Sequence, residues 1–361
     1  MTQAEAARTQ PFGVLLVDKP SGPTSFDVVA FVRWALQVRA VGHCGTLDPA
    51  ATGMLVVCVG EATKLVEALS GVDKCYRARI ELGRSTTTAD AEGETLDQVP
   101  VPMGVEARAK AVLETMIGEL SLPPPAYSAV RVAGQRAHDL ARAGEVVELA
   151  ERAMVIRSAE AIVVEREGER VWVEATLDVG KGTYVRSIAE ELGRRLDLPA
   201  HLQTLRRLRC GGLDLQREEV VSGLIAEPLG AGRKGPRWQI SLAKPVEAEG
   251  AEGAPIAESS NEARRAAARA FLRERLLMPW TCLPFESREL GPSDATDPLL
   301  ARLRQGQRLR FDAALQAAFG LDDVEGPCAL ALPDSGELLI ASRSCGRFAP
   351  ERWIRFAPVR G

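Results

Sequence analysis

Residues 42–59 read GHCGTLDPAATGMLVVCV, a loop that passes directly into a buried strand. The first twelve residues contain glycine, proline and threonine but no apolar periodicity, which predicts a loop. The next six, Met54 to Val59, are continuously apolar, as in a strand covered on both faces. The loop presents one carboxylate, Asp48, beside the sheet. On this segment alone, Asp48 would be an aspartate that makes a turn hydrogen bond before Pro49.

A strand and a helix are predicted upstream of this segment. Residues 13–18 (GVLLVD) form a short apolar run that enters the turn at 19–23 (KPSGP), as in a buried strand followed by a loop. Thr24 or Ser25 can cap the next helix, and apolar residues at helical spacing give it one apolar face. We expect this helix to end near Val38.

Downstream, the pattern alternates between strands and helices. Residues 76–82 alternate as in a strand, and residues 171–179 do so most clearly, so their five apolar side chains should point to one face. A helix is predicted at 185–196. The order lacks a regular βαβ rhythm, which indicates an α+β fold with a mixed sheet rather than a doubly wound parallel one.

The composition changes in the last third of the chain. Glycine, proline, glutamate and alanine dominate 228–261, which predicts a disordered insertion because large apolar residues are few. An alanine- and arginine-rich helix at 262–278 is expected to return the chain to the first domain. Two β-like runs at 328–332 and 337–342, separated by Pro-Asp-Ser-Gly, predict a hairpin. We therefore expect a flexible tail at 1–10, a main domain at 11–287 and a small β-rich domain at 288–361.

Composition places the chain among ordinary soluble globular proteins. It has 361 residues, 46% hydrophobic and 26% charged. The first ten residues lack the apolar core of a signal peptide, and no apolar stretch has the roughly 18 residues of a membrane span, so we expect a cytoplasmic protein. Seven scattered cysteines without a C-x-x-C pair and three dispersed histidines predict neither a disulfide framework nor a metal site.

The net charge of −4 shows no overall excess of the basic residues that phosphate-binding proteins usually carry, but local charge can differ from the total. Arginine clusters at positions 206, 207 and 209 and again at positions 302, 304, 308 and 310. Taken alone, each cluster is most simply interpreted as a solvated face.

Five segments together closely resemble the bacterial tRNA pseudouridine-55 synthase (TruB-type) family. They are GVLLVDKPSGPTS (13–25), GHCGTLDPAATG (42–53), DKCYRARIELG (73–83), PPPAYSAV (123–130) and KGTYVRS (181–187). The resemblance implies a pseudouridine synthase fold with a largely antiparallel central sheet and flanking helices. It also implies an isomerase that acts without cofactor or metal on the T-loop uridine, position 55, of tRNA.

The resemblance assigns the catalytic roles to three residues. Asp48 matches the catalytic carboxylate, which acts as a nucleophile on the sugar or the base or assists deprotonation of the sugar; the sequence leaves these routes open. A carboxylate under a base in a dry pocket needs a counter-ion, and Arg186 is the candidate. Tyr76 matches the tyrosine that stacks on the target base and takes the C5 proton.

Four further residues are expected to bind substrate. Tyr184 and Leu205 match the residues that back the uracil ring, and His43 matches a residue that helps to extrude the base from the tRNA elbow. Lys19 supports the loop or binds an RNA phosphate. Cys44 stands where the family usually has threonine, and we interpret it as a small filler.

The segment 303–309 (LRQGQRL) and the β runs after it resemble the RNA-binding PUA module, so the small domain is expected to hold the tRNA arm through phosphates. We expect a monomer that contacts the T-arm and elbow and needs no protein partner. The alternative is a tRNA-binding or remodelling protein whose binding matters more than catalysis. A glycosidase is disfavoured because such enzymes use paired carboxylates, and this loop has one.

Overall fold

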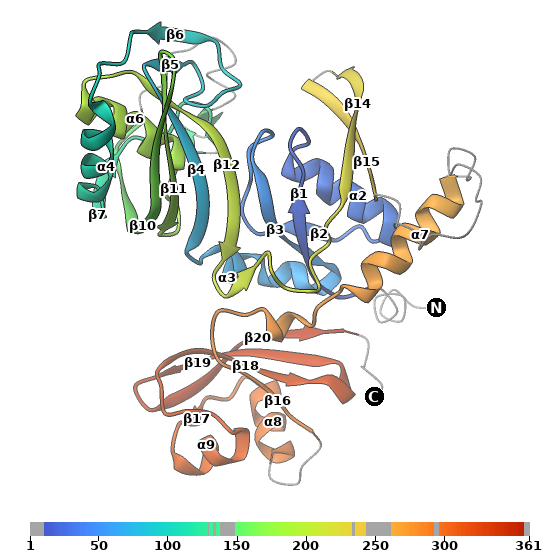
Figure 1. The fold of residues 1–361 in the computed structure, drawn as a ribbon. Coiled ribbons are helices and arrows are strands. Elements are labelled where there is room, and N and C mark those ends of the chain that lie inside the picture. The colour runs from blue at the N-terminus through green and yellow to red at the C-terminus, as the bar shows by residue number, and fades with distance from the viewer. Residues whose placement is uncertain are drawn as a thin grey trace.

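The computed structural model describes residues 11–356, apart from 129, 133–134, 138–148, 233–234, 243–260 and 292–295. The predicted tail at 1–10 lies outside the described residues, as does the later part of the predicted insertion. Two sheets organise the rest of the chain, one above the other in Figure 1.

The larger sheet has nine strands among the described residues. Across it the order is β1 (Gly13–Lys19), β3 (Thr52–Val59), β12 (Ala200–Cys210), β4 (Lys74–Leu82), β11 (Arg170–Val179), β10 (Arg152–Glu167) and β7 (Gly118–Leu122), with β2 (Val41–His43) beside β3 and β13 (Leu213–Asp214) beside β12. The β3–β12 pair is parallel and the other pairs of the sheet are antiparallel. The predicted mixed, largely antiparallel α+β fold is confirmed.

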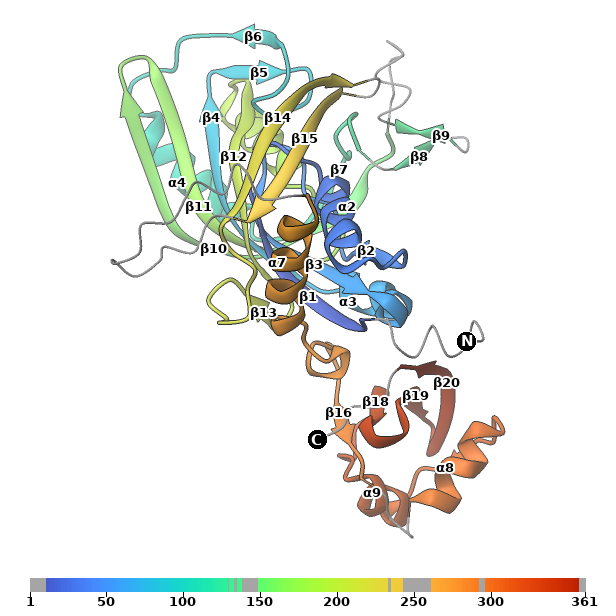
Figure 2. The same ribbon diagram turned by 90° about the vertical axis from the view of Figure 1, so that its right-hand side faces the viewer.

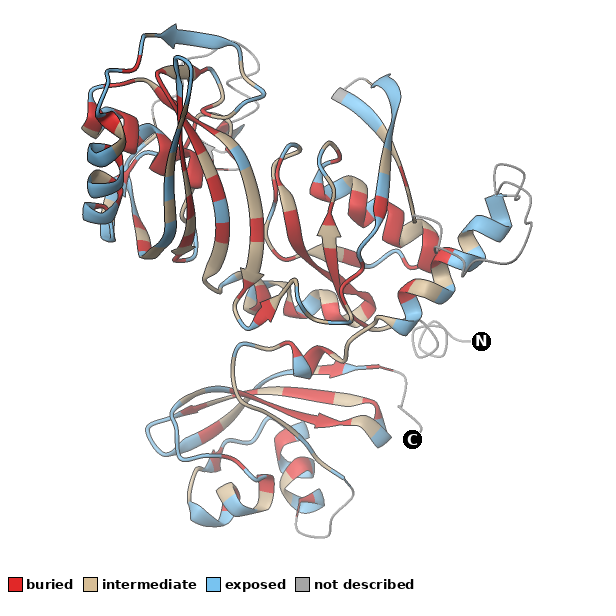
Figure 3. Ribbon diagram, viewed as in Figure 1, coloured by how far each residue is buried: buried red, intermediate tan, exposed pale blue. Residues whose placement is uncertain are grey.

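Strands β1 and β3 are buried on both faces, as their continuous apolar sequences predict (Figure 3). Leu15 and Val17 of β1 belong to the core beneath the helices, whereas Val14 and Leu16 belong to a second core on the opposite face. The second core includes Ala331, Leu338 and other residues of the smaller sheet, so the two sheets share buried apolar contacts.

Four helices accompany the larger sheet: α2 (Ser25–Leu36), α4 (Val105–Thr115), α6 (Val185–Leu196) and α7 (Asn261–Glu274). Thr24 caps α2, and its hydroxyl and the Asp27 carboxylate form a reciprocal capping box. The helix ends at Leu36 because Gln37 adopts a left-handed conformation, with φ 56°. Helix α6 has the bounds predicted from the sequence.

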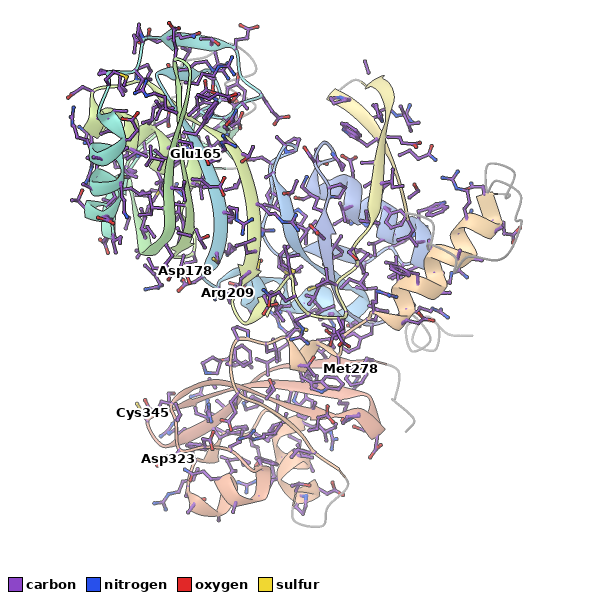
Figure 4. The ribbon with its side chains drawn as sticks, in the orientation of Figure 1. Glu165, Asp178, Arg209, Met278, Asp323 and Cys345 are labelled. Carbon is purple, nitrogen blue, oxygen red and sulfur yellow. The ribbon has the colours of Figure 1, made fainter. Side chains whose placement is uncertain are left out.

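The alternation predicted for 171–179 is confirmed, since the five apolar side chains of β11 are all buried. The opposite face carries mainly polar and charged side chains, with the buried Trp172 ring beneath Arg79. Arg79 pairs with Glu165 at 3.5 Å, and Arg209 pairs with Asp178 (Figure 4).

The smaller sheet has five strands among the described residues: β16 (Ser287–Glu289), β18 (Gly326–Leu332), β19 (Glu337–Ser344), β20 (Arg347–Arg355) and β17 (Leu309–Arg310). Helices α8 (Asp297–Arg304) and α9 (Ala313–Phe319) pack on it through their buried leucine and phenylalanine side chains. The predicted hairpin is confirmed as β18 and β19, which a short 3₁₀ turn at Pro333–Ser335 joins.

The remaining elements are short: η1 (Gly60–Leu65), α3 (Val66–Ser70), β5 (Arg84–Thr86), β6 (Thr95–Gln98), β8 (Arg131–Val132), β9 (Gln135–Arg136) and η3 (Pro279–Thr281). Within the described part of the chain, no helix combines the length and apolar character needed to cross a membrane.

The interpretation of 228–261 as a disordered insertion is wrong for its first part. Strands β14 (Leu224–Gly232) and β15 (Gly235–Leu242) form an antiparallel hairpin there. Leu224 and Ile240 are buried in the main core, and these few apolar anchors outweigh the poor overall composition. Residues 243–260 lie outside the described residues. Helix α7 ends at Glu274 rather than Met278, because the chain then extends and Leu277 pairs with Val14.

Candidate active site

The loop that carries Asp48 is fixed by two buried side chains from other segments, Ser25 and Arg207. The Ser25 hydroxyl donates to the Leu47 carbonyl at 3.0 Å and accepts from the Leu47 amide at 2.8 Å. Arg207 donates to the carbonyls of Met54, Thr46 and Gly45 at 2.6, 3.4 and 3.1 Å. The loop is therefore preorganised. Its first residues were expected to be irregular, but Gly42 and His43 pair with β3.

Asp48 and Arg186 meet, although 138 residues separate them in the sequence. The Arg186 Nη2 lies 3.1 Å from Asp48 Oδ2 and 3.3 Å from Oδ1. The same guanidinium donates to the Thr88 and Tyr127 carbonyls at 3.1 and 3.0 Å, which locks its orientation. Arg186 is buried, whereas the Asp48 side chain remains 37% exposed. The carboxylate is thus open to a ligand on one side and paired on the other.

A second carboxylate shares the guanidinium. Asp90 Oδ2 lies 3.5 Å from Arg186 Nη1 and is 14% exposed. Burial raises the pKa of Asp48, the charge of Arg186 opposes this rise, and the charge of Asp90 adds to it. Arg186 therefore offsets two effects that would otherwise favour the neutral acid.

Tyr76 lies on β4 directly opposite Arg207 of β12, and Ala78 lies opposite Leu205. Opposed residues of an antiparallel pair share a face, so Tyr76 and Leu205 line the same side of the sheet. Burial raises the pKa of Tyr76; the Arg207 charge opposes this rise and the Asp48 charge contributes to it. The phenol is therefore held neutral near the carboxylate. Tyr184, half-buried, immediately precedes α6 and stands two residues before Arg186.

His43 is half-buried at the end of β2, one residue before the loop. Burial lowers its pKa, and the nearby Arg207 charge adds to this effect, so the ring is held neutral. Its Nδ1 is buried and has no hydrogen-bond partner in the described structure.

Lys19 does not occupy a substrate-binding position. Its side chain has no exposed surface, and its ammonium donates to the carbonyls of Pro20, Pro23 and Pro49 at 2.9, 2.7 and 2.9 Å. Burial lowers its pKa to about 8. Of the two roles expected for Lys19, the geometry supports the one in the loop and excludes direct contact with a phosphate.

Sequence reasoning missed Arg207 and Asp90. Arg207 is 1% exposed, so the interpretation of 206–209 as a solvated face is wrong at this position. Its neighbour Arg206 forms a bidentate pair with Asp18 at 2.8 and 3.0 Å. The alternation of a β-strand, which turns every second residue inward, is the signal that separates Arg207 from its neighbours.

The site can supply one partly exposed carboxylate, a buried guanidinium, a neutral phenol and apolar walls. Among the described residues, no group of three or more histidine, cysteine, aspartate or glutamate side chains gathers where it could hold a metal ion. Cys44 is buried, with its sulfur 3.5 Å from that of Cys58, which agrees with its interpretation as a filler.

Known proteins resemble the larger part of this chain. Residues 33–185 match the family model described as TruB family pseudouridylate synthase, N-terminal domain. The chain is 46% identical over 219 residues to the tRNA pseudouridine synthase B of Thermobifida fusca, covering 60% of this chain and 75% of that protein. It is 42% identical over 226 residues to the protein of the same name from Ectopseudomonas mendocina, covering 63% and 72%.

A solved structure shares the fold at greater distance. A chain of an H/ACA RNP bound to a substrate RNA containing 2′-deoxyuridine superposes with a TM-score of 0.56 at 19% identity, covering 98% of this chain and 87% of that one. A chain from an archaeal box H/ACA sRNP complex gives a TM-score of 0.54 at 19% identity, covering 97% and 89%.

Proposed function

The chain belongs to the TruB family of pseudouridylate synthases, and from this premise we propose that it isomerises uridine 55 in the T-loop of tRNA with Asp48 as the catalytic carboxylate. Family membership makes it an isomerase that acts on a uridine of tRNA. The observation that carries the assignment to Asp48 is its ion pair with the buried Arg186, in a loop held by hydrogen bonds from Ser25, Lys19 and Arg207.

The reaction breaks the bond between N1 and C1′, turns the base and joins C5 to C1′. The C5 proton leaves and N1 gains one, so neither an oxidant nor an energy source is consumed. Asp48, ionised and partly exposed, attacks the sugar or the base, or deprotonates the sugar, to start this exchange. Because its pKa is raised by burial, it is a stronger base and nucleophile than a free aspartate.

The other residues bind and orient the base. In this proposal Tyr76 stacks on the uracil, and its neutral phenol takes the C5 proton as it releases its own hydroxyl proton to water. Tyr184 and Leu205 back the ring, which suits a slot with apolar walls for a flat ligand. His43, half-buried at the end of β2, helps to hold the base or its phosphate outside the stack.

The β-rich unit that follows residue 287 is proposed to be PUA-like and to hold the tRNA arm. Arg308 and Arg310 are exposed there, with the Arg310 side chain 87% exposed. Such side chains bind phosphates and position an RNA without reading its sequence. We propose that the protein works as a monomer in the cytoplasm and contacts the T-arm and elbow of its substrate.

Incubation with an unmodified tRNA transcript tests this function. Pseudouridine at position 55 is expected with the wild type, and pseudouridine elsewhere or nowhere would overturn the assignment. A protein that only binds or remodels tRNA would bind the transcript and leave every uridine unchanged.

A further inference from the structure

The hairpin of β14 and β15 stands outside the large sheet, beside the catalytic loop. The chain reaches it along β1, where the Val221 amide donates to the Leu16 carbonyl at 2.7 Å and the Asp18 amide donates to the Val221 carbonyl at 3.0 Å. Val221 pairs in parallel with Val17, so the chain runs toward the Lys19 end of β1. Figures 1 and 2 show the hairpin extending past the ends of β1 and β3.

The Trp238 side chain packs the hairpin against Gly22, in the turn that is hydrogen-bonded to the loop of Asp48. A Cβ added at Gly22 would lie only 2.6, 2.8 and 3.0 Å from three carbons of the Trp238 ring, so the indole lies directly on this glycine. Gly22, with φ +107°, donates its amide to the Pro49 carbonyl at 2.9 Å, and Pro49 follows Asp48. One side chain and one hydrogen bond thus connect the hairpin to the catalytic loop.

Beyond Trp238 the hairpin extends away from the large sheet, and its side chains become exposed (Figure 1). Pro228, Leu229 and Arg237 are exposed, and Leu229 is 54% exposed. The register shifts between Pro228 and Gly230, so Leu229 lies in a bulge of β14. An isolated two-stranded hairpin is marginally stable, and the free end of this one presents the apolar Leu229 and the cation Arg237, with the exposed carboxylate of Glu227 nearer its base.

We propose that the free end of this hairpin, residues 228–232 and 235–237, is an RNA-contacting arm that grips the substrate strand beside the extruded uridine. This inference rests on the proposed function. Arg237 would bind a phosphate and Leu229 a ribose or base face, the combination that suits an irregular RNA strand. RNA is favoured over a protein because Trp238 and Gly22 connect the arm to the catalytic loop. The target uridine is one nucleotide of a tRNA chain, so the nucleotides on either side of it must lie against the protein surface around the site.

The test compares two charge reversals in the full-length protein. Arg237→Glu alters the arm, and Arg108→Glu is the matched control because Arg108 is exposed on α4, an element on the other flank of the sheet (Figure 1). Binding of a T-arm transcript is measured over a range of salt concentrations in the Asp48→Asn background, which prevents turnover. Arg237→Glu is expected to weaken binding about tenfold and to reduce the salt slope by about one, whereas Arg108→Glu changes neither.

Leu229→Asp supplies an independent variant on the same arm and is expected to weaken binding severalfold. Both positions are exposed, so urea unfolding midpoints should match the wild type and exclude misfolding. If Arg237→Glu and Leu229→Asp both bind the transcript like Arg108→Glu, the arm does not contact RNA and the proposal is overturned; an arm that serves a protein partner would give this result. Pseudouridine formation by the wild type is measured in parallel, because its absence would instead overturn the proposed function.

Discussion

Replacing Arg186 with glutamine should move the pH dependence of catalysis, because Arg186 is the cation that faces Asp48. The two charged groups approach to 3.1 Å. A pair about 4 Å apart interacts by about 4 kcal/mol at an effective dielectric constant of about 20. Asp48 is 37% exposed, so solvent screens part of this attraction. We therefore assign about 2 kcal/mol to the attraction between Arg186 and Asp48. At about 1.4 kcal/mol per factor of ten, the loss raises the pKa of Asp48 and shifts its ionisation equilibrium about 30-fold toward the neutral acid.

The direction in which the pH profile moves depends on which form of Asp48 is active. Asp48 acts as an ionised carboxylate, so a higher pKa moves the acidic limb of the kcat/KM profile to higher pH. The loss of Arg186 also leaves Asp90 facing Asp48 without the shared cation, which shifts the pKa in the same direction. Arg186→Gln should therefore lose activity about tenfold or more on the acidic limb and regain part of it as the pH rises.

The assay is single-turnover pseudouridine formation on a tRNA transcript, measured from pH 5 to pH 9. Arg194→Gln is the matched control, since Arg194 lies on the same helix, is 72% exposed and pairs with Glu191 instead. Its profile should coincide with that of the wild type. A uniform loss of rate in Arg186→Gln at every pH, with an unmoved inflection, would refute the electrostatic reasoning and assign Arg186 a structural role only.

Three further substitutions test separate parts of the account. Lys19→Met should destabilise the fold by about 2–3 kcal/mol in urea titrations, because three carbonyls lose their donor, while the salt dependence of tRNA binding stays unchanged; a reduced salt slope would instead indicate a phosphate contact. Tyr76→Phe keeps the ring and removes the hydroxyl, so release of tritium from C5-labelled uridine should slow by about 10²-fold with little change in tRNA affinity; equal release would exclude the phenol as proton acceptor. Arg308→Glu combined with Arg310→Glu should raise KM about tenfold, and the loss should disappear at saturating tRNA; unchanged KM would remove these residues from the binding surface.

The elements with strong local patterns could be predicted from the sequence. The continuous apolar runs of β1 and β3 and the alternation in β11 follow from burial on two faces or one, and the structure has strands at these places. Helix α6 agrees to the residue, and Thr24, one of the two predicted candidates, caps α2. These features depend on residues only a few positions apart in the sequence, so the pattern of residue types along the chain is enough to predict them.

Features that depend on distant residues were harder to predict. The hairpin of β14 and β15 has a composition typical of disorder, and it is ordered by Leu224 and Ile240 in a core made by other segments. Arg207 looked like part of a basic surface, yet it is buried because the loop carbonyls face it. The pairing of Asp48 with Arg186 was expected only through the motifs, whereas the sharing of Arg186 with Asp90 became visible once the chain was folded.

The central claim is that Asp48 isomerises uridine 55, and one measurement tests it directly. Wild type and Asp48→Asn are incubated with an unmodified tRNA transcript, and pseudouridine is mapped along its length. Pseudouridine is expected at position 55 with the wild type and nowhere with Asp48→Asn, although the variant still binds the transcript. Pseudouridine formed by Asp48→Asn at the wild-type rate, or none formed by the wild type, would contradict it.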